Sequence, residues 1–121
     1  MDATQLLIAF GLVLLAVAAL LGFVQERHRD RPEQFAGWRV VHAGGTAGAV
    51  QLLALAAIWP RISDQGMASG LLAAAMISVT YAFFFGPLAT VLGQPRLARA
   101  VNIVGAVVAV PAYLALPLAL L

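Results

Sequence analysis

The chain has 121 residues, of which 63% are hydrophobic and 10% are charged, and its mean hydropathy is +0.97. Such a composition indicates lipid rather than water as the surrounding solvent, and therefore an integral membrane protein. The absence of cysteine excludes disulfides, thiolate metal sites and dithiol redox chemistry. The seven cations are all arginine and lie in or beside connecting segments, which favours membrane orientation over nucleic-acid binding.

Four charge-free apolar runs are each about as long as the roughly 20 residues that a transmembrane helix needs. They predict helices over residues 5–24, 38–59, 68–92 and 97–121. The N-terminus carries Asp2 and no basic residue before the first run, so this run is interpreted as a retained helix rather than a signal peptide. The sequence therefore predicts an all-α fold, a single domain over residues 1–121 that forms an antiparallel four-helix bundle in the membrane.

The first connection, "QERHRDRPEQFAG", has the mixed charge, proline and glycine of a solvated loop, and His28 within it is predicted to be a surface side chain. The second helix is expected to carry one tryptophan at each membrane interface, Trp38 and Trp59. A turn at Ser63, Asp64 and Gly66 follows.

Prolines mark the two remaining helices. Pro87 predicts a kink in the third helix, and Pro111 is expected to interrupt the fourth.

Most arginines lie near connections one and three, so these connections are predicted to be cytoplasmic and both termini to face outward. The expected location is a bacterial-type inner membrane, crossed several times.

Polar side chains inside a span are costly and are therefore functional candidates. Serine and threonine can bond to the backbone one turn earlier and carry little information. The informative side chains are His42, Gln51, Tyr81 and Asn102. Gln51 is most simply a hydrogen-bonding group between helices.

Small residues surround His42 in "HAGGTAGA". His42, Gly45, Thr46 and Ala49 share one face of the second helix at 100° per residue, and the opposite face carries a GxxxG step from Gly44 to Gly48. The GxxxG step predicts close approach of another helix backbone. The small residues beside His42 also leave room for a flat cofactor.

Two similar spacings suggest one polar site. "RVVH" and "RAVN" place His42 and Asn102 three residues after an arginine, so both lie at similar depth if connections one and three share a side. They are expected to face one cavity, toward which Tyr81 reaches from deeper in the span. From the residues alone, His42 is either a hydrogen-bonded interfacial residue or an axial ligand of haem iron.

The stretch "GWRVVHAGG", continuing to "LLALAAIWPRI", resembles the second helix of small four-helix membrane isomerases typified by styrene oxide isomerase and hydroxylaminobenzene mutase. "TYA" at Thr80 to Ala82 looks like the third-helix motif of the mutases, and "PAYL" at Pro111 to Leu114 is similar to a fourth-helix stretch of the epoxide isomerases.

This resemblance implies a homotrimer that holds haem b, with His42 as the axial iron ligand and Gly45 and Thr46 beside the cofactor. It also implies an isomerase in which ferric haem acts as a Lewis acid on a small aromatic epoxide or arylhydroxylamine. Tyr81 and Asn102 are the candidate catalytic residues that line the pocket. The chain departs from the family motif at two positions, because Gly48 and Phe83 stand where the family has asparagines.

Two other functions remain open. One is a non-catalytic haem-binding membrane protein that kept the fold and lost the two amides. The other is a small transporter, which is disfavoured because no Asp or Glu lies inside a predicted span. A two-histidine cytochrome fits poorly, since the only other histidine, His28, lies in the charged connection. The expected partners are the lipid bilayer and a small aromatic substrate, and no nucleic acid.

Overall fold

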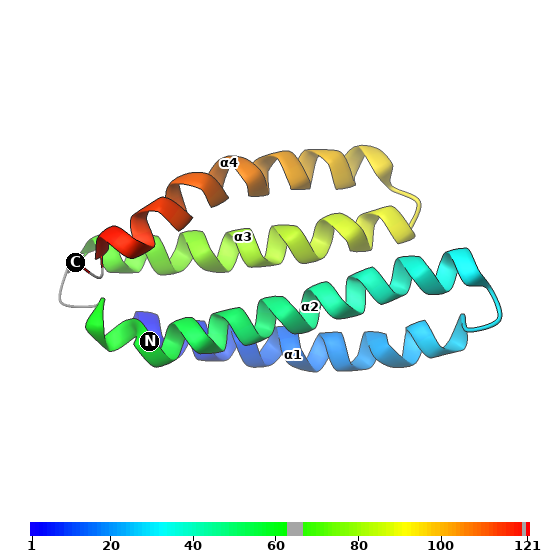
Figure 1. The fold of residues 1–121 in the computed structure, drawn as a ribbon, viewed down its shortest axis with the longest axis horizontal. Coiled ribbons are helices and arrows are strands. Elements are labelled where there is room, and N and C mark those ends of the chain that lie inside the picture. Colours follow the sequence, from blue (N-terminus) through cyan, green and yellow to red (C-terminus); the bar gives the residue numbers. More distant parts are fainter. Residues whose placement is uncertain (63–66, 120) are drawn as a thin grey trace.

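The computed structural model describes residues 1–62, 67–119 and 121. In chain order it contains the helices α1 (Ala3–Arg27), α2 (Pro32–Ile58), the short 3-10 helix η1 (Trp59–Arg61), α3 (Met67–Val91) and α4 (Pro95–Ala119). The four long helices run antiparallel (Figure 1), and each is long and apolar enough to cross a membrane. The predicted all-α membrane bundle is confirmed. The turn predicted at Ser63, Asp64 and Gly66 lies outside the described residues.

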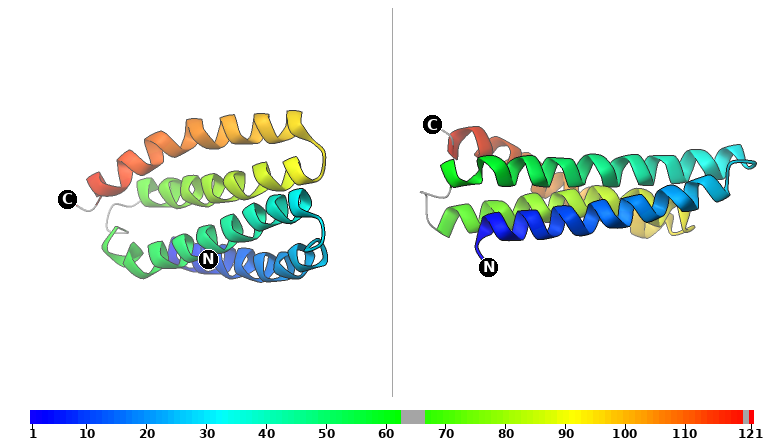
Figure 2. Two further views of the ribbon diagram at one scale, coloured as in Figure 1. Left: turned by 45° about the vertical axis from the view of Figure 1, so that its right-hand side comes forward. Right: turned by 90° about the horizontal axis from the view of Figure 1, so that it is seen from below.

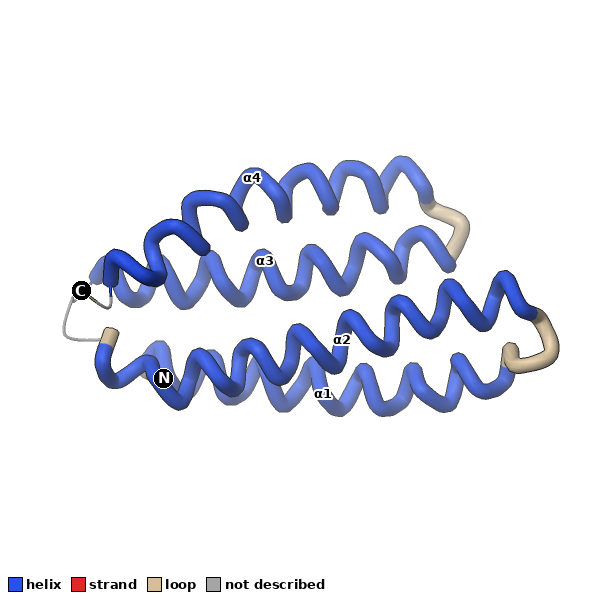
Figure 3. The backbone as a smooth tube through the Cα atoms, in the orientation of Figure 1, coloured by secondary structure: helices blue, strands red, loops and turns tan. Residues whose placement is uncertain are grey.

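The helices associate as two pairs, α1 with α2 and α3 with α4, and contacts between α2 and α3 join the pairs. Figure 2 shows α4 lying over α3, away from α1. The first and third connections lie at the same end of the bundle (Figure 3). This confirms that the two connections share one end of the bundle, as the predicted orientation requires, while their cytoplasmic location stays a prediction.

The predicted long first connection is wrong. α1 continues to Arg27 and α2 begins at Pro32, so only residues 28–31 connect them. Proline is favoured at the first position of a helix, because its missing N–H has no partner there in any case. Gly37 is part of α2, where a Cβ would come within 2.7 Å of Val91 Cγ1 on α3. The proline therefore starts the helix, and the glycine lets α3 approach.

The expected interruption of the fourth helix is also wrong. α4 continues as a helix through both Pro111 and Pro117, and Figure 1 shows it curving over α3 toward its C-terminal end. α3 likewise continues through Pro87. Membrane helices tolerate proline because neighbouring groups and local adjustments compensate for the lost backbone hydrogen bond.

Two clusters of buried side chains form the core, one near each end of the bundle. The cluster near the termini includes Trp59, Leu7, Leu52 and Met76. The other, toward the first and third connections, consists of Leu14, Val41, Ala49 and Phe84. Trp59 is completely buried inside the protein and begins η1 at the end of α2; its location at the membrane interface stays a prediction. Its ring belongs to a cluster to which all four long helices contribute side chains.

Candidate functional site

His42 lies on α2 and points toward α1. Its Nδ1 is 2.6 Å from the backbone carbonyl oxygen of Ala18. A carbonyl oxygen can only accept a hydrogen bond, so in this contact Nδ1 carries the proton and donates it. In the neutral ring the lone pair therefore lies on Nε2.

Nε2 of His42 has no hydrogen-bond partner among the described residues, and the ring as a whole is half-buried. In the described part of the chain, the fully covered side-chain nitrogen and oxygen atoms without a partner are Gln25 Oε1 and Trp59 Nε1. Nε2 is not among them, so it remains accessible at the seam between α1 and α2. The site thus presents one imidazole lone pair to the surroundings.

The small residues beside His42 are packed against protein. A Cβ on Gly45 would stand 3.0 Å from Ala18 Cβ and 3.1 Å from the ring of Phe84. Thr46 donates its hydroxyl to the His42 carbonyl oxygen at 2.9 Å, as expected for a threonine in a span. Gly45 therefore lets α1 and α3 approach α2 beside the imidazole.

The two glycines of the GxxxG step differ in their surroundings. A Cβ on Gly48 would stand 2.7 Å from Thr80 Cγ2 and 3.3 Å from Leu14 Cδ2, whereas one on Gly44 would meet nothing within 4 Å. Other helices approach α2 closely at Gly48 and, almost one turn earlier, at Gly45. The prediction that Gly44 mediates close packing is wrong within the described chain, because Gly44 faces away from the other helices.

Tyr81 lies on α3 and also points toward α1. Its hydroxyl donates to the Phe10 carbonyl oxygen at 2.9 Å, and its ring meets the Phe10 ring edge to face at 5.7 Å. Phe10 and Ala18 are eight residues apart, about 12 Å along a helix. Tyr81 and His42 thus bind the same helix at different depths and are not in contact.

Asn102 lies on α4 and is seated against α3, where the amide fills the space left by the missing side chain of Gly86. It lines a hollow of about 280 Å³ with Val40 of α2 and Pro87 of α3. Because residues 40 and 42 are about 200° apart on a helix, this hollow and the His42 imidazole lie on opposite faces of α2. Within one chain the two residues do not face one cavity.

Gln51 hydrogen-bonds Tyr113, donating from its amide nitrogen to the phenol oxygen. The bond joins α2 to α4, which confirms the interpretation of Gln51 as a group that bonds between helices. Sequence reasoning did not identify Tyr113 as its partner, because 62 residues separate them.

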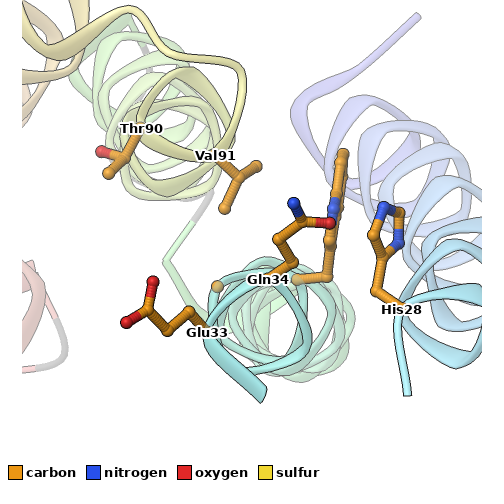
Figure 4. A pocket seen from close by; sticks show the side chains of 7 residues that line it. His28, Glu33, Gln34, Thr90 and Val91 are labelled. Carbon is orange, nitrogen blue, oxygen red and sulfur yellow. The ribbon is translucent and has the colours of Figure 1, made fainter. Parts of the chain in front are cut away.

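A second hollow, of about 500 Å³, opens at the end of the bundle that carries the first connection. Figure 4 shows His28, Glu33 and Gln34 around it, with Thr90 across from them on α3. His28 stacks on Trp38 with ring centres 5.9 Å apart and donates from Nδ1 to the Val24 carbonyl oxygen at 2.8 Å. The prediction of a simple surface side chain is wrong, because the early start of α2 brings Trp38 against His28.

The two positions that depart from the isomerase motif have different environments. Gly48 is enclosed by Thr80 and Leu14, whereas Phe83 is 45% exposed. An amide at position 48 would have to displace Thr80. The glycine at this position is therefore a packing requirement of this chain.

Comparison with known protein families matches residues 3–121 to the styrene oxide isomerase family. No curated protein and no solved structure matches the chain. The match extends over all four helices, including the His42 segment of α2, and it indicates a membrane isomerase. The chain belongs to the styrene oxide isomerase family.

Proposed function

We propose that this protein is a haem-dependent isomerase of a small aromatic epoxide or arylhydroxylamine, with His42 as the axial ligand of haem b. The observation that carries the proposal is the state of the imidazole. Nδ1 is bonded to the Ala18 carbonyl oxygen, and Nε2 is accessible and without a partner. Histidines that ligate metals commonly donate their other ring N–H to a backbone carbonyl in this way.

The metal-binding side chains that the chain offers suit an iron ion that a porphyrin ring already holds, as in haem. The described residues contain no group of three or more His, Cys, Asp or Glu side chains that could hold a metal ion. A single imidazole cannot complete the coordination of a bare ion, but it suffices for an iron already bound by four porphyrin nitrogens. His42 is the one histidine within a helix expected to cross the membrane.

Ferric haem, when bound, supplies a Lewis acid that weakens a bond to oxygen without net redox change. The residues of the chain have to hold the substrate and exclude water. The apolar spans exclude water, and we propose that the Asn102 amide orients the substrate from its hollow beside Val40 and Pro87. Tyr81, whose hydroxyl is bonded to the Phe10 carbonyl oxygen, would line the deeper wall.

His42 and Asn102 can line the same site if that site lies between two copies of the chain. Because they lie on opposite faces of α2, they can serve one site only if each copy supplies one of them to a neighbour. Such a site needs an oligomer, and the resemblance to the isomerase family implies a homotrimer. We propose this homotrimer in an inner membrane, with the arginine distribution placing the first and third connections on the cytoplasmic side. Co-expression of His42→Ala and Asn102→Ala chains tests this arrangement, because mixed oligomers regain some complete sites. Mixtures no more active than either variant alone would contradict it.

The absorption spectrum of the purified protein tests the haem proposal. A Soret band is expected in the wild type and in His28→Ala, and its loss is expected in His42→Ala. A colourless wild-type protein from haem-replete cells, or a His42→Ala protein that keeps the band, would reject it.

The packing around Gly48 supports a second candidate, a haem-binding protein without catalytic activity. Thr80 and Leu14 occupy the space that the family's amide would need. Turnover of an aryl epoxide or an arylhydroxylamine by the haem-loaded protein separates the two functions. Haem binding without turnover of either substrate class would favour the binder.

A further inference from the structure

The imidazole of His42 is held by α1 rather than by its own helix. Nδ1 lies 2.6 Å from the Ala18 carbonyl oxygen. A Cβ built on Gly22, one turn farther along α1, would have three ring atoms of His42 as its nearest neighbours: Cε1 at 3.2 Å, Nδ1 at 3.4 Å and Nε2 at 3.7 Å. The part of the ring that carries both nitrogens thus lies against a helix surface without a side chain.

We propose that the Ala18 carbonyl and Gly22 form a positioning element for His42, which selects the tautomer of the ring and sets the direction in which Nε2 points. The proposal rests on the proposed function only where it names haem iron as the group that Nε2 binds. It gives a functional role to α1, in which the sequence indicates no candidate site residue.

The Ala18 carbonyl determines the tautomer. A helix carbonyl has two lone pairs, of which the helix itself uses one, so the Ala18 oxygen can accept a second proton from His42 Nδ1. A free neutral histidine side chain in water prefers its proton on Nε2. The contact with α1 therefore imposes the less common tautomer, in which Nε2 is ready to bind a metal without first losing a proton.

Gly22 determines where the ring can lie. Nonbonded carbon atoms are at their optimal separation at about 3.5–4.0 Å, so a Cβ at 3.2 Å from Cε1 would push the ring away by a few tenths of an ångström. That movement changes both the hydrogen bond to Ala18 and the direction of Nε2. A valine at position 22 would add two further methyl groups to a Cβ that itself lies 3.7 Å from Nε2.

Gly11 provides a matched control on the same helix. A Cβ at Gly11 would stand 3.0 Å from Leu53 Cγ, so Gly11→Ala tightens the contact between α1 and α2 at least as much as Gly22→Ala does. Gly11 is eleven residues from Gly22, about 16 Å along a helix. The control thus crowds the same pair of helices without touching His42.

The tautomer can be measured without haem. The full-length protein with ¹⁵N-labelled histidine is placed in lipid nanodiscs, and the His28→Gln variant isolates the His42 signals. The proposal predicts a proton on Nδ1 and a lone pair on Nε2. A proton on Nε2, or exchange between the two forms, would overturn it. This result is independent of haem binding, so a wild type that fails to bind haem rejects the proposed function while the tautomer still decides the present inference.

The ring orientation can be measured with haem b added. Electron paramagnetic resonance of the ferric protein and the iron–imidazole stretching frequency report the direction and strength of the axial bond. Both signals should shift in Gly22→Ala and match the wild type in Gly11→Ala, and Gly22→Val should weaken haem binding about 10-fold or more. Signals from Gly22→Ala that match both the wild type and Gly11→Ala would overturn the role of Gly22.

Discussion

The contact between Gly48 and Thr80 limits how closely α2 and α3 pack, and it offers a sharp test of the packing. A Cβ at position 48 would stand 2.7 Å from Thr80 Cγ2. Thr80 is only 4% exposed, and its hydroxyl donates to the Met76 carbonyl oxygen at 2.8 Å. Because that bond holds the threonine rotamer, Gly48→Ala must push the two helices apart.

The expected cost follows from two opposing effects. Overpacking of a tight contact costs about 1–3 kcal/mol, whereas alanine in place of a helical glycine contributes about 1 kcal/mol. Gly48→Ala should therefore lower the free energy of unfolding by about 1 kcal/mol. Thr80→Ser removes the Cγ2 methyl and keeps the hydroxyl. In that background, Gly48→Ala should be neutral or stabilise by up to about 1 kcal/mol.

Unfolding of the wild type, the two single variants and the double variant in mixed detergent micelles, followed by circular dichroism, measures the coupling. We expect an interaction energy of about 1 kcal/mol or more, since directly contacting residues couple within about 0.5–3 kcal/mol. An equal effect of Gly48→Ala in both backgrounds would refute the contact. Gly48→Asn, which restores the amide of the family motif, should be more destabilising than Gly48→Ala.

Three further predictions concern a tight contact, an unpaired indole and an interhelical hydrogen bond, all measured by the same unfolding assay. Gly86→Ala should destabilise the protein by up to about 2 kcal/mol, because its Cβ would overlap the Asn102 amide and overpacking costs about 1–3 kcal/mol, whereas alanine in place of a helical glycine contributes about 1 kcal/mol. Asn102→Ala should relieve that cost, and no relief would contradict the contact between Gly86 and Asn102. Trp59→Phe should change stability by less than about 1 kcal/mol, because the buried indole N–H has no partner to lose, whereas Trp59→Ala should cost about 3–5 kcal/mol. Tyr81→Phe should cost about 0.6 kcal/mol, a typical value for a hydrogen bond between membrane helices, and an unchanged stability would argue against its bond to the Phe10 carbonyl oxygen.

The number of helices and their antiparallel order were predictable because each apolar run is long enough to cross a bilayer and no connection is long enough to hold a further span. The ends of the helices were less predictable, since the same residue types occur in loops and in first turns. Proline often marks the end of a helix, but Pro32 begins α2. Pro111 lies within α4, because in lipid a helix cannot exchange its backbone hydrogen bonds for bonds to water.

The sequence by itself determined that His42 is the histidine placed within a span and that small residues surround it. Only the tertiary structure decided which face of α2 has a partner, and so which of Gly44 and Gly48 is packed. It also decided what holds the imidazole. The Ala18 carbonyl and Gly22 contribute a backbone oxygen and a missing side chain, neither of which has a residue-type signature, and they lie 20 residues or more from His42. Such a contact exists only once α1 is packed against α2.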